Sequence, residues 1–306
     1  MATILITGIS GSLASLCGER LVEEGHEVIG VDYRPKRPGA RRQITFYRAN
    51  YNKRLIEDVF RKHKPEAVLH LGRVGNLKAS RNKRFDLNVV GSAKIMELCI
   101  KHGTKRLVVL STYHIYGAHP HNHIPIFEDE PLRAAQTFPQ LVDAMQLDGL
   151  ASRFVFEHRK LRTVVLRPTN IVGPNINNAI STYLRSGTQA YLMGFSPMWQ
   201  FLHETDMVDA ALLALGGDDV GIFNVAGQGE VPIITALGYT GARLIPVPSP
   251  MANLILRLSG SLTIPPYFLD FMKYPCVIAD AKFRAAFGYA PKMSQQETIE
   301  STVFGA

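Results

Sequence analysis

Short runs of β-branched and aliphatic residues alternate with amphipathic helical patterns over the first two thirds of this chain. The runs predict strands at 3–7, 27–32, 44–48, 67–71, 106–111 and 163–167, with helices between them at 12–24, 52–63, 86–102 and 139–158. Such alternation is typical of βαβ units. The pattern therefore predicts the α/β fold class, with a Rossmann-like, doubly wound parallel sheet.

The first strand runs directly into a turn of small residues that opens the first helix. Gly8, Gly11 and Ala14 hold the positions where small side chains permit a tight bend, close helix packing and the approach of bare backbone to a pyrophosphate. Asp32 ends the second strand, where its carboxylate can accept both ribose hydroxyls of an adenosine. The pattern predicts a dinucleotide-binding site.

The residues after Asp32 leave the identity of the dinucleotide open. Arg34, Lys36 and Arg37 follow closely enough to neutralise a ribose 2′-phosphate, so NADP is possible. Because the Asp32 carboxylate would repel that phosphate, we favour NAD.

The composition of the chain changes after Pro174. Proline, glycine and aromatic residues become frequent there, and the predicted elements become shorter. We interpret this part as a smaller, interleaved C-terminal substrate lobe. Residues 1–173 would form the dinucleotide-binding Rossmann lobe, to which 200–226 return with a strand at Ile222–Val225, and 174–199 and 227–306 would form the substrate-binding lobe. The sequence Ser294-Gln295-Gln296-Glu297 has the form of a capping box and predicts a closing helix.

Composition and charge narrow the class of partner. The net charge of +8 belongs to the first part of the chain, because residues 1–110 carry 21 Lys and Arg against 10 Asp and Glu. Solvated surfaces or attraction of an anionic cofactor or substrate would account for this charge. We expect no nucleic acid, since no aromatic-interleaved or helix-turn-helix pattern accompanies it, and contact with an acidic membrane surface is an alternative that we do not favour.

The cysteines and the hydropathy pattern indicate the compartment. Cys17, Cys99 and Cys276 are odd in number and far apart, which predicts reduced, buried thiols rather than a disulfide framework. No apolar run has the length of a membrane span. We therefore expect a cytoplasmic protein.

An ordered series of motifs follows the glycine turn and Asp32, and it identifies a family. The motifs are His70-Leu71-Gly72-Arg73, Asn88-Val89-Val90-Gly91-Ser92, Val109 to Gly117, Leu166 to Pro174, Phe201 to Asp206 and Asp280 to Pro291. With them the chain resembles, nearly end to end, the extended short-chain dehydrogenases/reductases of the NAD-dependent epimerase/dehydratase type. The resemblance implies a small-molecule substrate and a homodimer formed through the helices at 86–102 and 139–158.

The resemblance and the glycine turn together define the expected cofactor contacts. These are Gly8, Ser10, Gly11, Ser12, Leu13, Asp32, Arg34, Asn50, Tyr51, Leu71, Gly72, Arg73, Asn88, Leu110, Pro168 and Asn170. At one of them the chain departs from the family, since Asn50-Tyr51 replaces the usual acidic contact to adenine. An asparagine can still accept a hydrogen bond from the adenine amino group.

A second departure concerns proton transfer. The family uses a tyrosine and a lysine four residues later, on the helix after the active-site strand, and Leu141 and Met145 are the most natural occupants of those places here. None of the 11 tyrosines has a lysine at the fourth following position. Since a positioned acid or base accelerates a reaction about 10² to 10⁴-fold, another group must act or the reaction must differ.

Candidate catalytic residues remain near the end of the active-site strand. Thr112 stands at the position of the catalytic Ser or Thr, and Tyr113, His114 or Asp143 could supply the missing acid or base. The chain would then be an atypical oxidoreductase, epimerase or dehydratase that acts on a carbonyl or hydroxyl group. The alternative is an NAD(P)-binding sensor or ligand-binding protein without redox turnover.

Three further segments bear on ligands. Trp199-Gln200 stands where nucleotide-sugar epimerases of this family carry an arginine for the diphosphate, which makes a UDP-sugar less expected. The histidines at 114, 119, 121 and 123 are interpreted as part of a solvated loop, and we predict no metal site. The stretch 265–272 is interpreted as core of the second lobe, with a hydrophobic substrate wall or a membrane-touching surface as the alternatives.

Overall fold

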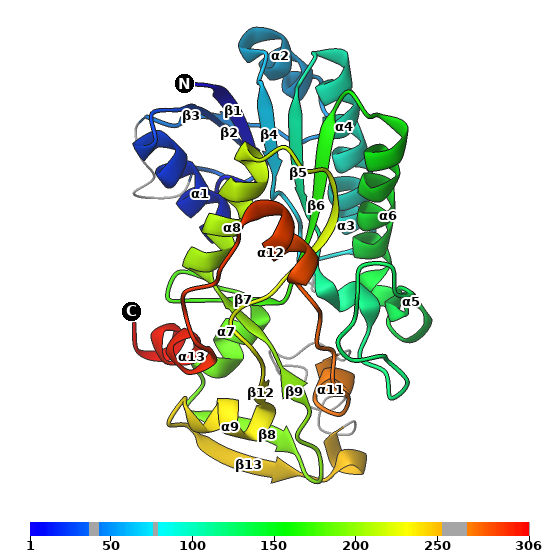
Figure 1. Ribbon diagram of the computed structural model, residues 1–306, viewed down its shortest axis with the longest axis vertical. Coiled ribbons are helices and arrows are strands. Elements are labelled where there is room, and N and C mark those ends of the chain that lie inside the picture. Colours follow the sequence, from blue (N-terminus) through cyan, green and yellow to red (C-terminus); the bar gives the residue numbers. More distant parts are fainter. Residues whose placement is uncertain (37–42, 76–78, 253–267, 306) are drawn as a thin grey trace.

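A seven-stranded parallel sheet forms the centre of the first lobe in the computed structural model, which describes residues 1–36, 43–75, 79–252 and 268–305 (Figure 1). The strand order is β11-β6-β5-β4-β1-β2-β3. The strands are β1 (Thr3–Thr7), β2 (Glu27–Asp32), β3 (Thr45–Arg48), β4 (Ala67–His70), β5 (Arg106–Leu110), β6 (Arg162–Pro168) and β11 (Gly221–Val225). The predicted strands and the returning strand near 222 are confirmed.

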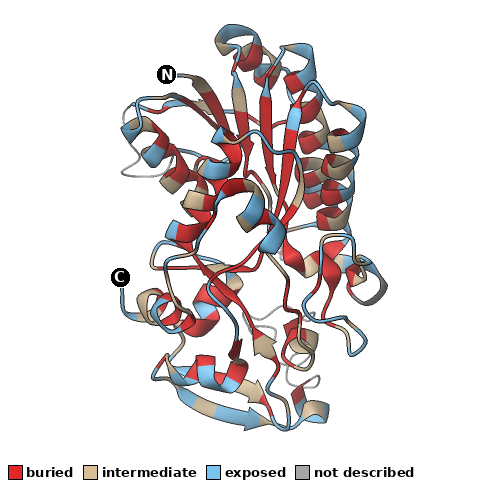
Figure 2. Cartoon of the chain, in the orientation of Figure 1, coloured by how far each residue is buried: buried red, intermediate tan, exposed pale blue. Residues whose placement is uncertain are grey.

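Helices cover both faces of this sheet. One face packs against α1 (Ser12–Glu23), α8 (Glu204–Gly216) and α12 (Ala281–Phe287), and the other against α2 (Arg54–His63), α4 (Gly91–Lys101) and α6 (Val142–Glu157). Because successive strand residues face opposite sides, Ile4 and Ile6 enter the first core and Leu5 enters the second. Figure 2 shows the resulting buried sheet under helices with exposed outer faces. The doubly wound α/β fold is confirmed.

The predicted helix at 86–102 is longer and less regular than its apolar pattern indicated. It begins with α3 (Arg81–Phe85), continues through a π-helical turn at Asp86–Val90, and only then becomes α4. Ser80 caps α3 by accepting a hydrogen bond from the Lys83 amide. The predicted helix at 139–158 likewise starts as a 3₁₀ turn at Pro139–Leu141 before α6.

The second lobe consists of short elements below the sheet in the view of Figure 1. Three two-stranded ladders join β7 (Asn170–Val172) to β10 (Phe201–His203), β8 (Thr188–Leu192) to β13 (Arg243–Val247), and β9 (Met198–Trp199) to β12 (Val231–Pro232). Its helices include α7 (Ala179–Leu184), α9 (Ile233–Gly238), α11 (Phe268–Phe271) and α13 (Gln295–Phe304), and a 3₁₀ turn (Tyr113–Tyr116) and α5 (Ala134–Thr137) follow β5 in the chain. The capping box of α13 is present, with the Ser294 amide donating to the Glu297 carboxylate.

One C-terminal element differs from the predicted division of lobes. We placed 227–306 in the second lobe, but Phe283 and Phe287 of α12 pack against Phe223 of β11, with ring centroids 5.9 and 5.2 Å apart. The apolar face of α12 covers the edge strand of the main sheet, so α12 lies in the core of the first lobe.

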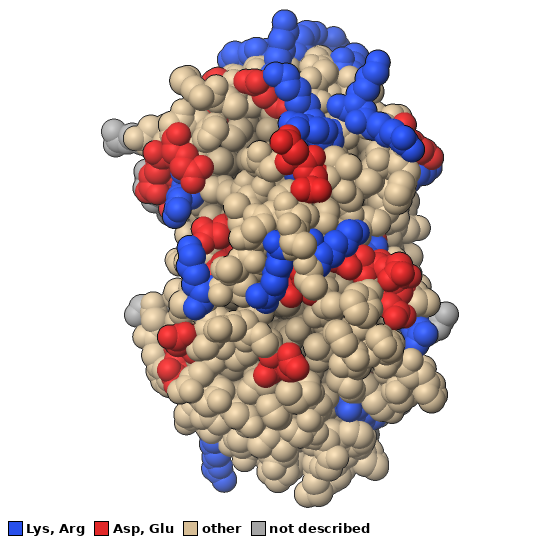
Figure 3. All heavy atoms as spheres, viewed as in Figure 1, with Lys and Arg blue, Asp and Glu red and all other residues tan. Residues whose placement is uncertain are grey.

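Cationic side chains gather over the end of the molecule that carries α2, as the charge distribution along the chain predicts, whereas the visible face of the second lobe carries few charges (Figure 3). The three cysteine thiols are buried, and burial raises the pKa of Cys17 and of Cys99 to about 12. Over the described ranges, no helix combines the length and apolarity that crossing a bilayer requires.

Candidate functional site

The carboxyl ends of the central parallel strands meet at one edge of the sheet, and several of the predicted site residues follow these strand ends. The chain proceeds from β1 outward to β3 and then crosses to β4 on the other side of β1 (Figure 1). In open α/β sheets, this reversal leaves a crevice at the strand ends where ligands bind. Leu71, Leu110 and Pro168 follow or end three of these strands, and Leu71 and Pro168 are buried.

The glycine turn exposes backbone at the start of α1. Gly8 adopts φ +75°, and a Cβ placed there would lie 2.6 Å from the Gly72 Cα, so no other residue fits. Its amide donates to the Val31 carbonyl at 2.8 Å, and the Gly11 amide donates to the Gly8 carbonyl at 2.7 Å. Ser12 begins the helix. The close backbone and the helix N-terminus fit a pyrophosphate.

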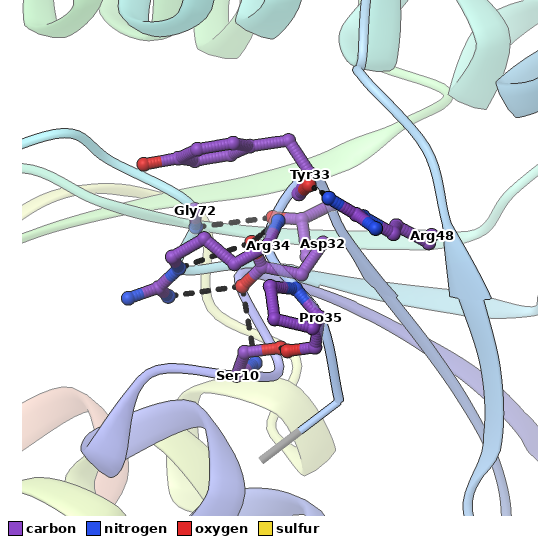
Figure 4. Close-up of polar contacts among 8 residues, drawn as sticks. Ser10, Asp32, Tyr33, Arg34, Pro35, Arg48 and Gly72 are labelled. Atoms are coloured by element: carbon purple, nitrogen blue, oxygen red, sulfur yellow. Dashed lines mark hydrogen bonds and ion pairs between the residues drawn. The ribbon is translucent and has the colours of Figure 1, made fainter.

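Asp32 lies fully buried beside this turn, and its carboxylate is held by neighbouring donors (Figure 4). The Ser10 amide donates to Oδ2 at 3.1 Å, and the Arg34 amide donates to Oδ1 at 2.9 Å. The Arg34 guanidinium pairs with the same carboxylate, with Nη2 2.9 Å from Oδ2. Leu13 lies in α1 and packs on the core below.

Tyr51 fills the space under the turn, deeper than a surface contact to adenine would require. It is buried, and its hydroxyl would lie 2.2 Å from a Cβ placed on Gly72. Burial and the charge of Asp32 raise the pKa of Tyr51, so its phenol stays protonated. The half-buried Asn50 accepts a hydrogen bond from the Asn52 amide at 3.4 Å. Of the two residues predicted to contact adenine, Tyr51 is thus a core residue, whereas Asn50 is only half-buried.

Asn88 links the strand-end loop to the helices behind it. Its side chain accepts from the Val74 amide at 2.7 Å and donates to the Val74 carbonyl at 3.1 Å. It also donates to Asp143, whose carboxylate forms a buried ion pair with Arg84. Asp143 therefore serves α3 and α6 as a structural counter-ion in this arrangement, and its role as an acid or base stays a prediction.

Thr112 and His114 meet at the end of β5. The Thr112 Oγ1 lies 2.8 Å from the His114 Nδ1, at hydrogen-bond distance, and it accepts the His114 amide at 3.4 Å. Burial lowers the pKa of His114 to about 3, and the nearby charge of Arg73 adds to this effect. The imidazole is therefore neutral at neutral pH. The Tyr113 ring packs on the His114 ring with centroids 4.4 Å apart.

The helix after the active-site strand carries no replacement for the tyrosine and lysine. Residues 117–159 include neither residue type, so their absence does not depend on how the helix is aligned. Leu141 and Met145 pack with Ala134 and Phe138 in a small apolar cluster. Tyr116 is unsuited as a base, because burial raises its pKa to about 12.

A buried ion pair under the active-site strand was missed at the sequence level. Arg167 of β6 donates through Nε and Nη2 to the Asp148 carboxylate of α6, at 3.0 and 2.7 Å. Ser111 donates to the same carboxylate at 2.6 Å, and Arg167 also donates to the Tyr116 hydroxyl at 2.8 Å. The pair thus fixes both ends of the segment that carries Thr112. The one sequence feature that could have indicated this ion pair is that Asp148 and Arg167 are charged residues within otherwise apolar segments.

Aromatic side chains line the second-lobe side of this segment. The Phe271 ring lies 5.0 Å from the His114 ring and 5.7 Å from the Tyr113 ring. Trp199 donates from Nε1 to the Phe271 carbonyl at 2.7 Å, and the side-chain amide of Gln200 donates to the Ile278 carbonyl and accepts from the Ile278 amide. Trp199 and Gln200, which stand where nucleotide-sugar epimerases carry an arginine, therefore hold neighbouring backbone groups in place. The part of 265–272 before residue 268 lies outside the described residues.

Three buried polar atoms near the same strands have no hydrogen-bond partner within the described part of the chain: Thr169 Oγ1, Asn170 Oδ1 and His203 Nε2. Asn170 and His203 belong to the paired strands β7 and β10. Buried polar atoms of this kind are usually satisfied by a ligand or by water. Among the same described residues, no cluster of three His, Cys, Asp or Glu could hold a metal ion.

The crevice, the glycine turn and the buried carboxylate define a dinucleotide-binding protein of the Rossmann class. The sequence model of the NAD dependent epimerase/dehydratase family matches residues 4–226, and the chain belongs to this family. Membership confirms the predicted family, NAD as its cofactor and an enzyme of the epimerase/dehydratase kind.

Individual relatives are distant. An uncharacterized protein of Mycobacterium tuberculosis is 26% identical over 312 residues, which cover 97% of this chain and 82% of that protein. The UDP-glucose 4-epimerase of Halalkalibacterium halodurans is 28% identical over 182 residues, 58% of this chain and 53% of that protein. The structure of Thermus thermophilus UDP-glucose 4-epimerase with NAD superposes with a TM-score of 0.77 at 23% identity, covering 98% and 97% of the two chains.

Proposed function

We propose that this chain catalyses an NAD-dependent oxidation, epimerisation or dehydration at a hydroxyl or carbonyl carbon, with Thr112 holding the reacting oxygen. The observation that carries the proposal is the contact between the Thr112 hydroxyl and the His114 imidazole at the end of β5. The glycine turn, Asp32 and the strand-end loop would hold the cofactor. When bound, NAD accepts and returns a hydride.

His114 acts on the substrate through Thr112. Since its pKa is lowered to about 3, its imidazole is too weakly basic to retain a proton at neutral pH, but it can still orient the threonine hydroxyl. Thr112 caps the 3₁₀ turn, and the Asp148–Arg167 pair fixes the segment from below. We therefore assign Thr112 the contact to the reacting oxygen and His114 a positioning role. The proton of an oxidised hydroxyl passes to water.

The substrate class follows from the aromatic side chains next to this pair. Trp199 and Gln200 offer no cation, and the buried rings of Phe271 and Tyr113 pack beside the His114 ring. An apolar or aromatic body would pack there, whereas the diphosphate of a UDP-sugar would lack a charged partner at this place. We propose a small organic alcohol or carbonyl compound with an apolar body.

Steady-state kinetics test these roles. A panel of UDP-sugars, steroid alcohols and acyl-carbonyl compounds is assayed through the absorbance of reduced nicotinamide. With the substrate so found, we expect T112V to lower kcat/KM at least tenfold, as loss of a hydrogen bond to the reacting oxygen does, with little change in NAD affinity. H114Q should lower kcat several-fold, and the pH profile of the wild type should show no inflection near pH 6.5. The exposed-loop variant H121Q serves as the control, and equal losses in H121Q and H114Q would refute the assignment.

The alternative is an NAD-binding protein without turnover, and the specific observation in its favour is the lack of Tyr and Lys between 117 and 159. If NAD binds tightly but no compound in the panel changes its oxidation state, this alternative replaces the catalytic proposal.

We propose further that the chain acts in the cytoplasm as a homodimer. Large apolar side chains are exposed along the adjacent α3–α4 and α6 segments: Phe85, Val90, Ile100, Val142 and Phe156. Phe156 alone leaves 68% of its surface exposed. Exposed apolar side chains on two neighbouring helices could be buried against the same helices of a second copy.

Light scattering after size exclusion tests the dimer. We expect the wild type to have twice the 33.9 kDa mass of the chain, and I100E to shift it to the monomer, because a carboxylate cannot be buried without a partner. L213E changes an exposed leucine of α8, outside this surface, and should remain dimeric. A monomeric wild type at micromolar concentration contradicts the proposal.

A further inference from the structure

A groove runs beside β11, the edge strand of the main sheet. It has a volume of about 1200 Å³ and is lined by the loop 127–130, the end of α6 and the first part of β11. Its apolar residues are partly accessible, since Phe127 and Val220 are 44% and 49% exposed and Ile222 is half-buried. Phe223, on the opposite face of β11, is instead covered by α12. The face of β11 toward α6 is therefore open to a partner.

This groove is separate from the crevice that holds the candidate active site. Leu161 and Thr163 at the start of β6 and Gly221 at the start of β11 contribute to its lining, so it lies toward the amino ends of these strands. The crevice lies at their carboxyl ends. None of the lining residues belongs to the predicted cofactor or catalytic residues. A ligand of the groove would therefore leave the crevice free.

The wall formed by the loop 127–130 is held in place by buried neighbours. The Glu128 carbonyl accepts from Arg167 Nη1 at 2.8 Å, and the Glu128 carboxylate accepts from the Asn224 amide at 2.9 Å. Ile126, directly before the loop, forms an isolated β-bridge with Ile278. Because a preformed site loses little conformational entropy on binding, this wall is suited to holding a partner.

Charges of opposite sign occupy the two ends of the groove. The charged lining residues are Glu128, Asp129 and Glu130 at one end and Arg159 and Lys282 at the other. The acidic end lies toward the carboxyl end of β11, because Glu128 bonds the Asn224 amide there. The cationic end lies toward the amino ends, because Lys282 donates to the Ile222 carbonyl at 2.8 Å and Arg159 precedes β6. The groove is therefore negative at one end and positive at the other.

The free edge of β11 is unsuited to the addition of another strand. The Ile222 carbonyl and the Asn224 amide, which β11 turns away from β6, already bond to Lys282 and Glu128. Charged side chains placed in this way protect a sheet edge from pairing with an extended peptide. A helix satisfies its own backbone groups and needs no bond to the edge. The groove therefore favours a helix over a strand.

The direction of such a helix follows from the charges. A helix that lies like α6, which runs from the carboxyl end of β5 to the amino end of β6, would place its N-terminus at the acidic end of the groove. Its C-terminus would then lie at the cationic end. This is the favourable orientation, because a helix dipole is positive at the N-terminus and negative at the C-terminus.

We infer that this groove binds an amphipathic helix of a partner protein, laid along β11 in the direction of α6. The apolar stripe of the helix covers Phe127, Val220 and Ile222. Its first turn carries Lys or Arg against the acidic loop, and its last turn carries Asp or Glu against Arg159 and Lys282. The volume also exceeds the ~300–1,000 Å³ that is typical of small-molecule pockets. This inference involves neither cofactor nor turnover, so it stands apart from the proposed function.

Selection from a displayed peptide library, with the full-length chain as bait, tests the inference. The library encodes helices of about four turns with apolar residues at i, i+3, i+4 and i+7 and Lys or Glu at random between them. We expect enriched peptides to carry Lys in the first turn and Glu in the last, and to bind with micromolar dissociation constants in calorimetry. V220E should weaken binding at least tenfold. D129K/R159E should also weaken it at least tenfold, and should bind peptides with the reversed charges more tightly than the wild type does.

Arg153 and Glu157 of α6 provide the matched control. They form an exposed ion pair at 3.3 Å and do not line the groove, so R153E/E157K should leave the peptide affinity unchanged. Phe156 lines the groove and also belongs to the proposed dimer surface, so it is left unaltered. Circular dichroism spectra that match the wild type establish that each variant is folded.

Four outcomes would overturn the inference. They are that no peptide is enriched, that V220E binds the enriched peptides as tightly as the wild type does, that D129K/R159E shows no preference for reversed charges, or that R153E/E157K reproduces the loss. Light scattering checks for a second copy of the chain in the groove. V220E should keep the mass of the wild type, and a smaller mass would show that a second copy, and not a partner helix, occupies this place.

Discussion

Replacing Arg167 by leucine is expected to lower the free energy of unfolding by about 3–5 kcal/mol, because it leaves the buried Asp148 carboxylate without its counter-ion. The side chains of Arg167 and Asp148 are only 4% and 1% exposed, so water cannot take over the role of the guanidinium. The variant also loses the hydrogen bonds of Arg167 to the Tyr116 hydroxyl and the Glu128 carbonyl. Urea denaturation followed by circular dichroism measures the loss.

Arg162 supplies the control from the same strand. Its ion pair with Asp218 is exposed, so R162L should change the stability by less than about 1 kcal/mol. Replacing both partners, in D148L/R167L, should recover part of the stability, because the double variant buries no unpaired charge. If R167L and R162L have the same free energy of unfolding, the buried pair stabilises the fold no more than the exposed pair does.

Replacing Gly72 by alanine is expected to lower the free energy of unfolding by about 2–3 kcal/mol through overpacking against Tyr51. The new Cβ would lie 2.2 Å from the Tyr51 Oη and 2.7 Å from its Cζ, and the Tyr51 ring is itself buried. Gly72 therefore leaves the space that the Tyr51 side chain occupies.

A double-mutant cycle tests this match. Y51L/G72A should be more stable than the sum of its two single changes predicts, since leucine removes the atoms that the new methyl group meets. Gly149 in α6 has no atom within 4 Å of a Cβ position, so G149A should not destabilise the protein. Additive effects in the cycle would show that the tyrosine and the glycine are independent.

The strand and helix pattern and the glycine turn could be predicted from the sequence because each depends on residues close together in the chain. Thr3–Thr7 and Ser12–Glu23 have the expected bounds to within a residue. The Asp148–Arg167 pair could not be predicted, since it depends on the orientation of a helix against a strand. The separation of two residues in the sequence also does not show which residue a charged side chain pairs with. Asp143 therefore looked like a free carboxylate until its pairing with Arg84 was seen.

The interleaving of the lobes has a consequence for how the protein is made. The edge strand β11 joins β6 only after the second lobe has begun, and Arg106 at the start of β5 donates to the carbonyls of Ala214 and Asp219. During synthesis on the ribosome, six strands therefore emerge before the seventh, and the backbone of β6 stays unpaired along one side. Premature termination before residue 221 would yield a chain prone to edge-to-edge association, so this protein should depend on chaperones most while that segment is being translated.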